Sequence, residues 1–142
     1  MTYASGQEAV DMTLKTGTTV AQAGLILTND STNNTLDLTA VGEVGVFISA
    51  DESNRDAAGA LQTAAGATVS AYPMGGVMLV VATASQTWTT GVTVYATNAG
   101  LATTSSGSSA KAIGLYVGGG ETTSSVAGAS LIRVATSGAA IA

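Results

Sequence analysis

Few side chains in this sequence could carry out acid–base or nucleophilic chemistry. The chain contains no cysteine and no histidine, so it lacks the commonest transition-metal ligands and the side chain best suited to proton transfer near pH 7. Ser108-Ser109-Ala110-Lys111 matches the S-x-x-K motif of serine acyl-transfer enzymes, and Lys15-Thr16-Gly17 matches their K-T-G motif. Those enzymes need the serine and lysine on one helix, whereas here the serine lies in a Ser/Gly-rich segment and the order of the two motifs is reversed. We therefore expect no catalytic residues and no enzymatic activity.

Two other segments could bind a ligand. Three carboxylates cluster in Asp51–Asp56, but Arg55 and Asp56 stand where a calcium loop needs an oxygen ligand and a glycine. A solvated turn with a local Arg55–Asp56 ion pair is the favoured interpretation. Gly118-Gly119-Gly120 precedes Glu121, which puts a carboxylate where a phosphate would sit, so this run predicts an exposed loop. We expect no cofactor and no bound metal.

Aromatic and methionine side chains indicate where a contact surface could lie. Trp88 stands among small polar residues, so it either caps one end of a β domain or anchors an interface. Tyr72 and Met74 flank Pro73 and leave the same two alternatives open. Because Trp, Tyr and Met are enriched in subunit contacts, the candidate interface residues are Tyr3, Tyr72, Met74 and Trp88.

The elements that would position these residues are strands. β-Branched and aromatic residues occur in short runs separated by Gly, Asn and Ser, which is typical of an all-β chain. Asn98-Ala99-Gly100 predicts a hairpin turn, and Pro73 predicts a strand edge or a turn. Only Asp51–Ala67 has partly helical character, and its glycines limit it to one helical turn or a loop. The predicted strands are Leu25–Thr28, Thr35–Leu38, Gly45–Ser49, Thr68–Tyr72, Gly76–Ala82, Thr93–Ala96, Ala112–Val117 and Ser130–Ala135.

Composition limits both the core and the partners. Charged residues make up 9% of the chain and the net charge is −5, so a basic patch for nucleic acid is not expected. Large apolar residues are few for one domain of 142 residues and disulfides are excluded, so partner subunits are the expected source of further stability. The first six residues lack the features of a signal peptide, and the longest apolar run, Val77–Ala82, is too short for a membrane helix. The sequence predicts a soluble protein made in a cytoplasm, without nucleic-acid or membrane partners.

These patterns together predict a single all-β domain. We expect a compact β-sandwich or β-barrel-like fold over residues 25–142. Residues 1–24 alternate only weakly and contain no strong apolar cluster. We assign them to an extended N-terminal arm that orders against a neighbouring subunit; the alternative is a frayed strand of the same domain.

A progression of short motifs runs through the last third of the chain. Gly91-Val92-Thr93-Val94-Tyr95 is followed by a glycine turn, then by Ala112-Ile113-Gly114, and finally by Ile132-Arg133-Val134. The order of these motifs resembles that in the capsid decoration (head cement) proteins of tailed bacteriophages. The resemblance extends from about Gly42 onward and rests on strands and glycines.

This resemblance implies a function and a set of partners. It implies a β-sandwich or barrel-like subunit, usually a homotrimer, on the outer capsid surface of the virion. There it would bind the major capsid protein, bridge neighbouring capsomers and resist the pressure of packaged DNA. The family brings no catalytic residues, and Tyr72, Met74 and Trp88 would then lie in or near subunit contacts. The alternatives are another virion structural element, such as a head-fibre base, a tail component or a lectin-like surface-binding module, and, third, an enzyme.

Overall fold

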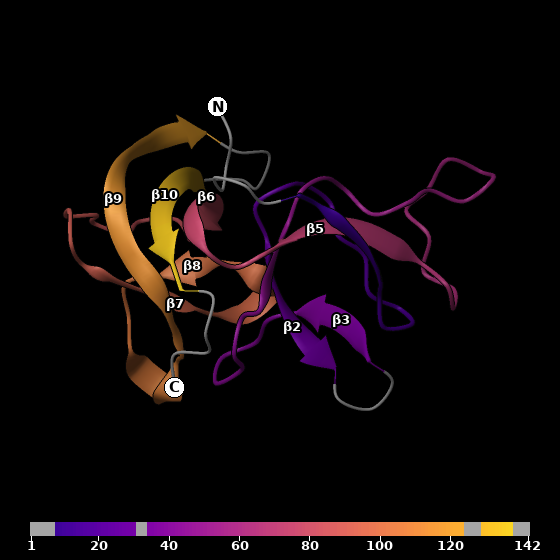
Figure 1. Ribbon diagram of the computed structural model, residues 1–142, viewed down its shortest axis with the longest axis horizontal. Coiled ribbons are helices and arrows are strands. Elements are labelled where there is room, and N and C mark those ends of the chain that lie inside the picture. The colour runs from indigo at the N-terminus through magenta and orange to yellow at the C-terminus, as the bar shows by residue number, and fades with distance from the viewer. Residues whose placement is uncertain (1–7, 31–33, 124–128, 138–142) are drawn as a thin grey trace.

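The chain folds into strands joined by loops and two short 3-10 turns. The structure, a computed structural model, describes residues 8–30, 34–123 and 129–137. It confirms the all-β prediction within those residues (Figure 1). The elements are β1 (Val10–Thr13), β2 (Ile26–Asp30), β3 (Thr35–Leu38), β4 (Phe47–Ser49), β5 (Thr68–Pro73), β6 (Gly76–Ala82), β7 (Thr93–Ala96), η1 (Asn98–Gly100), β8 (Ala102–Thr103), η2 (Gly107–Ser109), β9 (Ala112–Thr123) and β10 (Ser130–Thr136).

The strands form two sheets that lie side by side. The first is antiparallel with the strand order β1-β5-β4-β2-β3. Its two edge strands approach each other where Lys15 N–H donates to the Leu36 carbonyl at 2.8 Å, beside a bridge between Leu14 and Leu36. The second sheet is a closed barrel in the order β10-β6-β8-β7-β9, in which only the β6–β8 pairing is parallel. Figure 1 shows the barrel on one side and β2, β3 and β5 on the other.

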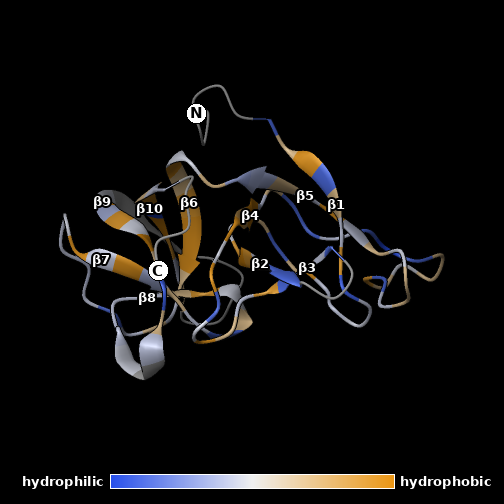
Figure 2. Ribbon diagram, turned by 60° about the horizontal axis from the view of Figure 1, so that its bottom comes forward, coloured by the Kyte–Doolittle hydropathy of each residue, from blue (hydrophilic) through white to orange (hydrophobic). Residues whose placement is uncertain are grey.

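Two hydrophobic clusters connect the sheets into one unit. The barrel cluster contains Met78, Val94 and Ile132 from the barrel together with Ile26 and Ile48 from the first sheet. The second cluster fills the first sheet and includes Val81 of β6 and Ala129, which directly precedes β10. Strands β4 and β6, which face this junction, are among the most hydrophobic in Figure 2. Because each cluster draws side chains from both sheets, the chain is a single compact β domain.

Most of the predicted strands are present. Thr35–Leu38, Gly76–Ala82 and Thr93–Ala96 have the predicted bounds, and the Asn98–Gly100 turn joins the antiparallel pair β7 and β8 as expected. The Gly118–Gly120 prediction was wrong, because these glycines continue β9 as far as Thr123 instead of forming a loop. Pro73 ends β5 just before the turn into β6, as predicted.

The connection between β4 and β5 contains no helix. Residues 51–67 form turns and loops with a single bridge between Arg55 and Leu61. The sequence predicts either one helical turn or a loop for this segment, and the structure agrees with the loop. Within the described residues, no helix is long and apolar enough to cross a membrane.

The N-terminal segment is part of the first sheet where the structure describes it. Strand β1 pairs with β5, with Val10 opposite Ala71. Beyond it, Leu14 and Val20 are 1% and 0% exposed. Buried Ser53 Oγ accepts a hydrogen bond from Val20 N–H at 3.0 Å and thereby holds the segment in place. Val10–Thr13 is therefore a strand of the same domain, as in the second alternative, and residues 14–24 continue from it as loop with one bridge at Leu14. Residues 1–7, with Tyr3, lie outside the described residues.

Candidate interaction surface

Of the predicted interface residues, Met74 belongs to the core. Its side chain is 7% exposed, and its methyl carbon lies next to Gly45, where an added Cβ would be 3.0 Å away. The turn between β5 and β6 therefore points this methionine inward. Its burial is explained within the chain, so we do not include it in the candidate surface.

Trp88 packs on the barrel from the connection between β6 and β7. It is half-buried, and its ring centroid is 5.4 Å from that of Tyr116, with the rings tilted by 33°. Tyr116 is 5% exposed and belongs to the barrel cluster, against which Trp88 also packs. This is the arrangement expected if Trp88 caps the barrel core. Its remaining exposed edge leaves it available to a partner as well.

Tyr72 lines an apolar hollow between the two sheets. Tyr72 and Ile48 are directly opposite each other in the first sheet, and Leu79 and Leu131 form the barrel side of the hollow. The hollow has a volume of about 70 Å³ and is lined almost entirely by apolar atoms. This is several times the space that one water molecule needs, so the hollow could accept one apolar side chain from a partner.

The outer face of the barrel carries exposed apolar residues that the sequence analysis did not single out. Leu115 and Val117 on β9 are 47% and 37% exposed, whereas Tyr116 between them is buried. Strand pairing places Leu115 opposite Ala135, and Arg133 lies in the next outward-facing row, opposite Leu79. We call Leu115, Val117, Arg133 and Ala135 the barrel face. It adjoins the hollow, because Leu79, which pairs with Arg133, lines the hollow.

Two irregularities in β9 shape the barrel face. At Gly114, an added Cβ would lie 2.1 Å from the Ala135 carbonyl oxygen, so only glycine allows β9 and β10 to approach this closely. The pairing register then shifts between Arg133 and Val134, and Arg133 Nε donates to the Gly118 carbonyl at 2.9 Å. This shift is a β-bulge, and such bulges re-aim the side chains beside them. The arrangement holds the Arg133 side chain against the strand that carries Val117.

Charge is divided unevenly between the two halves of the chain. Residues 1–73 contain eight acids and two bases, a net charge of −6, whereas residues 74–142 contain Lys111, Arg133 and Glu121, a net charge of +1. In the acidic half, Lys15 Nζ is 3.8 Å from Asp37 Oδ2. Lys111 and Arg133 make no ion pair with any side chain that the structure describes. The barrel half therefore presents the cations that are least neutralised locally.

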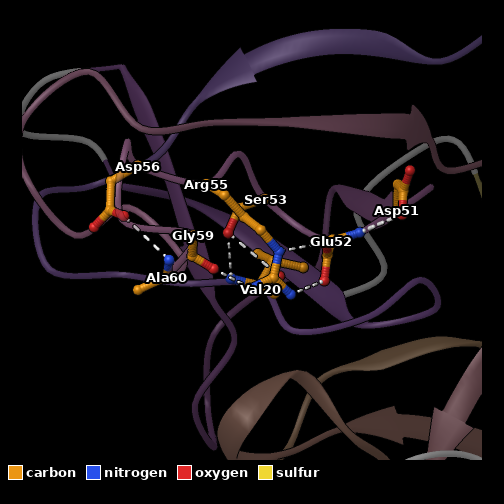
Figure 3. A network of polar contacts seen from close by, with 8 residues as sticks. All are labelled: Val20, Asp51, Glu52, Ser53, Arg55, Asp56, Gly59 and Ala60. Atoms are coloured by element: carbon orange, nitrogen blue, oxygen red, sulfur yellow. Dashed lines mark hydrogen bonds and ion pairs between the residues drawn. The ribbon is translucent and has the colours of Figure 1, made fainter.

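The acidic loop after β4 is built from its own hydrogen bonds, as Figure 3 shows. Arg55 donates to both carboxylate oxygens of Glu52, at 3.0 and 2.9 Å, and to the Gly59 carbonyl at 2.7 Å. The predicted Arg55–Asp56 ion pair was wrong, since Asp56 instead accepts hydrogen bonds from the Ala58 and Ala60 amides. The Glu52 carboxylate, through its hydrogen bond and its charge, raises the pKa of Arg55 above its ordinary value. The carboxylates serve loop structure, and the described residues hold no cluster of three or more metal-ligating side chains.

The S-x-x-K and K-T-G segments do not come together as one site. Lys15-Thr16-Gly17 follows β1 in the first sheet, and Lys15 there pairs with Asp37. Lys111 directly precedes β9 of the barrel, on the other sheet. The two motifs therefore belong to different sheets, and the surface that the geometry supports is the barrel face with the adjoining hollow.

Comparison with known proteins gives no identification. No protein-family model matches the chain, and no curated protein and no solved structure matches it either.

Proposed function

We propose that this chain is a structural virion protein that binds the outer capsid surface of a tailed bacteriophage as an oligomer. In this role it cements adjacent capsomers against the internal pressure of DNA. The major capsid protein and other copies of the chain are its partners, and the function requires no catalysis. Another virion element, such as a head-fibre base or a tail component, is the alternative.

The position of the resemblance in the fold supports this proposal. All three of its motifs lie in the closed barrel: Gly91–Tyr95 leads into and through β7, Ala112–Gly114 begins β9, and Ile132–Val134 lies in β10. Two of their glycines have physical roles. Gly91 has a φ of +91°, which favours glycine, and Gly114 permits the close approach of β10. The motifs that carry the resemblance thus lie in the barrel, and one of them contains the glycine that lets β9 and β10 approach closely.

The barrel face is the observation that carries the proposal. Leu115 and Val117 expose apolar surface on the outward face of β9, in a chain with only 9% charged residues. Apolar area that a contact removes from water stabilises that contact. A neutral surface also loses little hydration energy on contact, because few ions must be desolvated. Contacts of this kind between copies of the chain would join them into an oligomer, and an oligomer binds a symmetric capsid lattice through several sites at once, which raises its overall affinity.

Binding to heads tests the proposal. The full chain would be added to expanded heads that lack it, assembled from the major capsid protein of the virus that encodes the chain. Sedimentation would then separate bound from free protein. We expect saturable binding with a fixed number of copies per head. Free protein at every concentration would overturn the capsid assignment, and binding to tails or fibres alone would favour the alternative.

A further inference from the structure

A third exposed large apolar residue, Val10, belongs to the acidic half of the chain. Val10 on β1 is 46% exposed, and the neighbouring Glu8 and Asp11 are exposed too. Glu8 lies two residues before Val10, at the free end of the strand. We call these two residues the β1 patch. On the side away from β5, the stretch Val10–Thr13 pairs with no strand in the described parts of the chain.

The β1 patch and the barrel face have opposite charge and the same apolar character. The barrel face combines Leu115 and Val117 with Arg133, whose guanidinium has no carboxylate partner among the residues whose side chains the structure describes. The β1 patch combines Val10 with the Glu8 carboxylate. The net charges of the two halves of the chain are also opposite in sign: −6 for residues 1–73 and +1 for residues 74–142. Complementary charge of this kind steers and orients association.

Like surfaces are poorly suited to pair with each other. Two barrel faces packed around a two-fold axis would bring Arg133 of one copy close to Arg133 of the other. Two β1 patches would likewise bring carboxylates together. Like charges placed against each other across an interface cost several kcal/mol. A contact between unlike surfaces avoids this cost and is of the head-to-tail type, which forms rings where the rotation between copies closes and open filaments where it does not.

We propose that copies of this chain associate head to tail, with the β1 patch of one copy docked on the barrel face of the next. Val10 of one copy covers the Leu115–Val117 strand, and the Glu8 carboxylate pairs with Arg133. This proposal adds to the proposed function the two surfaces that join the copies. It rests on the proposed function only for its biological setting. The occupant of the barrel face is therefore a second copy of the chain.

A charge exchange tests this contact. The oligomeric state of the full chain would be measured by sedimentation velocity over a wide concentration range, for the wild type, Glu8→Arg, Arg133→Glu and the double variant. We expect each single variant to weaken association by about tenfold or more and the double variant to recover most of the loss, since it restores opposite charges. Glu43→Arg, which changes an exposed acid of the same half, is the matched control and should associate as the wild type does.

One further variant and the outcomes that contradict the proposal complete this test. Leu115→Asp should weaken association without changing the folded circular-dichroism spectrum, because its side chain is exposed. A wild-type chain that stays monomeric at every concentration, or a double variant that is weaker than either single variant, would overturn the proposal. Head binding is measured separately, so a monomer that still saturates heads would remove the head-to-tail contact and leave the capsid function in place.

Discussion

Replacing Gly114 by alanine would test the close packing of β9 on β10, on which barrel closure depends. The new Cβ would lie 2.1 Å from the Ala135 carbonyl oxygen, 2.8 Å from its carbon and 3.0 Å from Thr136 Cα. All three atoms belong to backbone, so no side-chain rotation can relieve the overlap. The strands must move apart by roughly 1 Å, because carbon and oxygen atoms in contact stay more than 3 Å apart.

The expected loss follows from these contacts. Overpacking a close-packed interior costs about 1–3 kcal/mol, and each ladder hydrogen bond weakened by strand separation adds about 1 kcal/mol. We therefore expect Gly114→Ala to lower the free energy of unfolding by at least about 3 kcal/mol, a large part of the 5–15 kcal/mol typical of a domain. Gly91→Ala is the matched control. It has a φ of +91° but nothing within 4 Å of the new Cβ, so only the backbone cost of about 1–2 kcal/mol applies.

Urea denaturation followed by tryptophan fluorescence provides the assay. Trp88 is the only tryptophan and packs on Tyr116 of β9, so its emission reports on the barrel directly. A Gly114→Ala protein that does not fold would agree with the reasoning. A loss no larger than that of Gly91→Ala would refute it, because the close approach of Ala135 would then have no energetic weight.

Three other substitutions test separate parts of the fold. Ser49→Ala should lower the free energy of unfolding by about 1–3 kcal/mol, because its buried Oγ accepts from Leu25 N–H at 2.9 Å and that donor would lose its partner; an unchanged urea midpoint would contradict this. Ile132→Ala, at 1% exposure in the barrel cluster, should cost about 2–5 kcal/mol in the same assay, and a loss under 1 kcal/mol would mean that the barrel core is loosely packed. Arg55→Ala should leave the melting temperature nearly unchanged but speed amide exchange in residues 52–61, since its bonds to Glu52 and Gly59 hold only that exposed loop; unchanged exchange there would argue against the loop network.

Local pattern was enough to find most strands. Thr35–Leu38, Gly76–Ala82 and Thr93–Ala96 have strong β-formers between clear turn residues, and these signals act within a few neighbours along the chain. Strand β1 was assigned to an arm because Val10–Thr13 has little apolar alternation of its own. It is a strand because β5 supplies its hydrogen bonds, which is a contact between residues about 60 positions apart.

Sheet closure could not be predicted from the sequence. The barrel requires a parallel pairing of β6 with β8, a strand of only two residues. Such a short strand has no periodicity to detect. The glycines of Gly118–Gly120 suggested a loop by composition, yet the partner strand β10 extends β9 through them. In both places, pairing with a strand that is distant in the sequence decides whether the segment is a strand.

The candidate surface could be predicted only in part. Residue type suggested Met74, but a methionine serves equally well in a core, and the turn after β5 directs it inward. Leu115 and Val117 were overlooked because β9 is apolar on both faces. Only the register of β9 with β10 shows which of those residues point outward.

An image of the native particle tests the capsid assignment most directly. Cryo-electron microscopy would compare virus particles with otherwise identical particles in which the gene for this chain is deleted. We predict additional density on the outer capsid surface of the complete particles, at symmetry-related sites between capsomers, into which the two-sheet fold can be fitted. Two capsid maps without any difference at the outer surface would contradict the account.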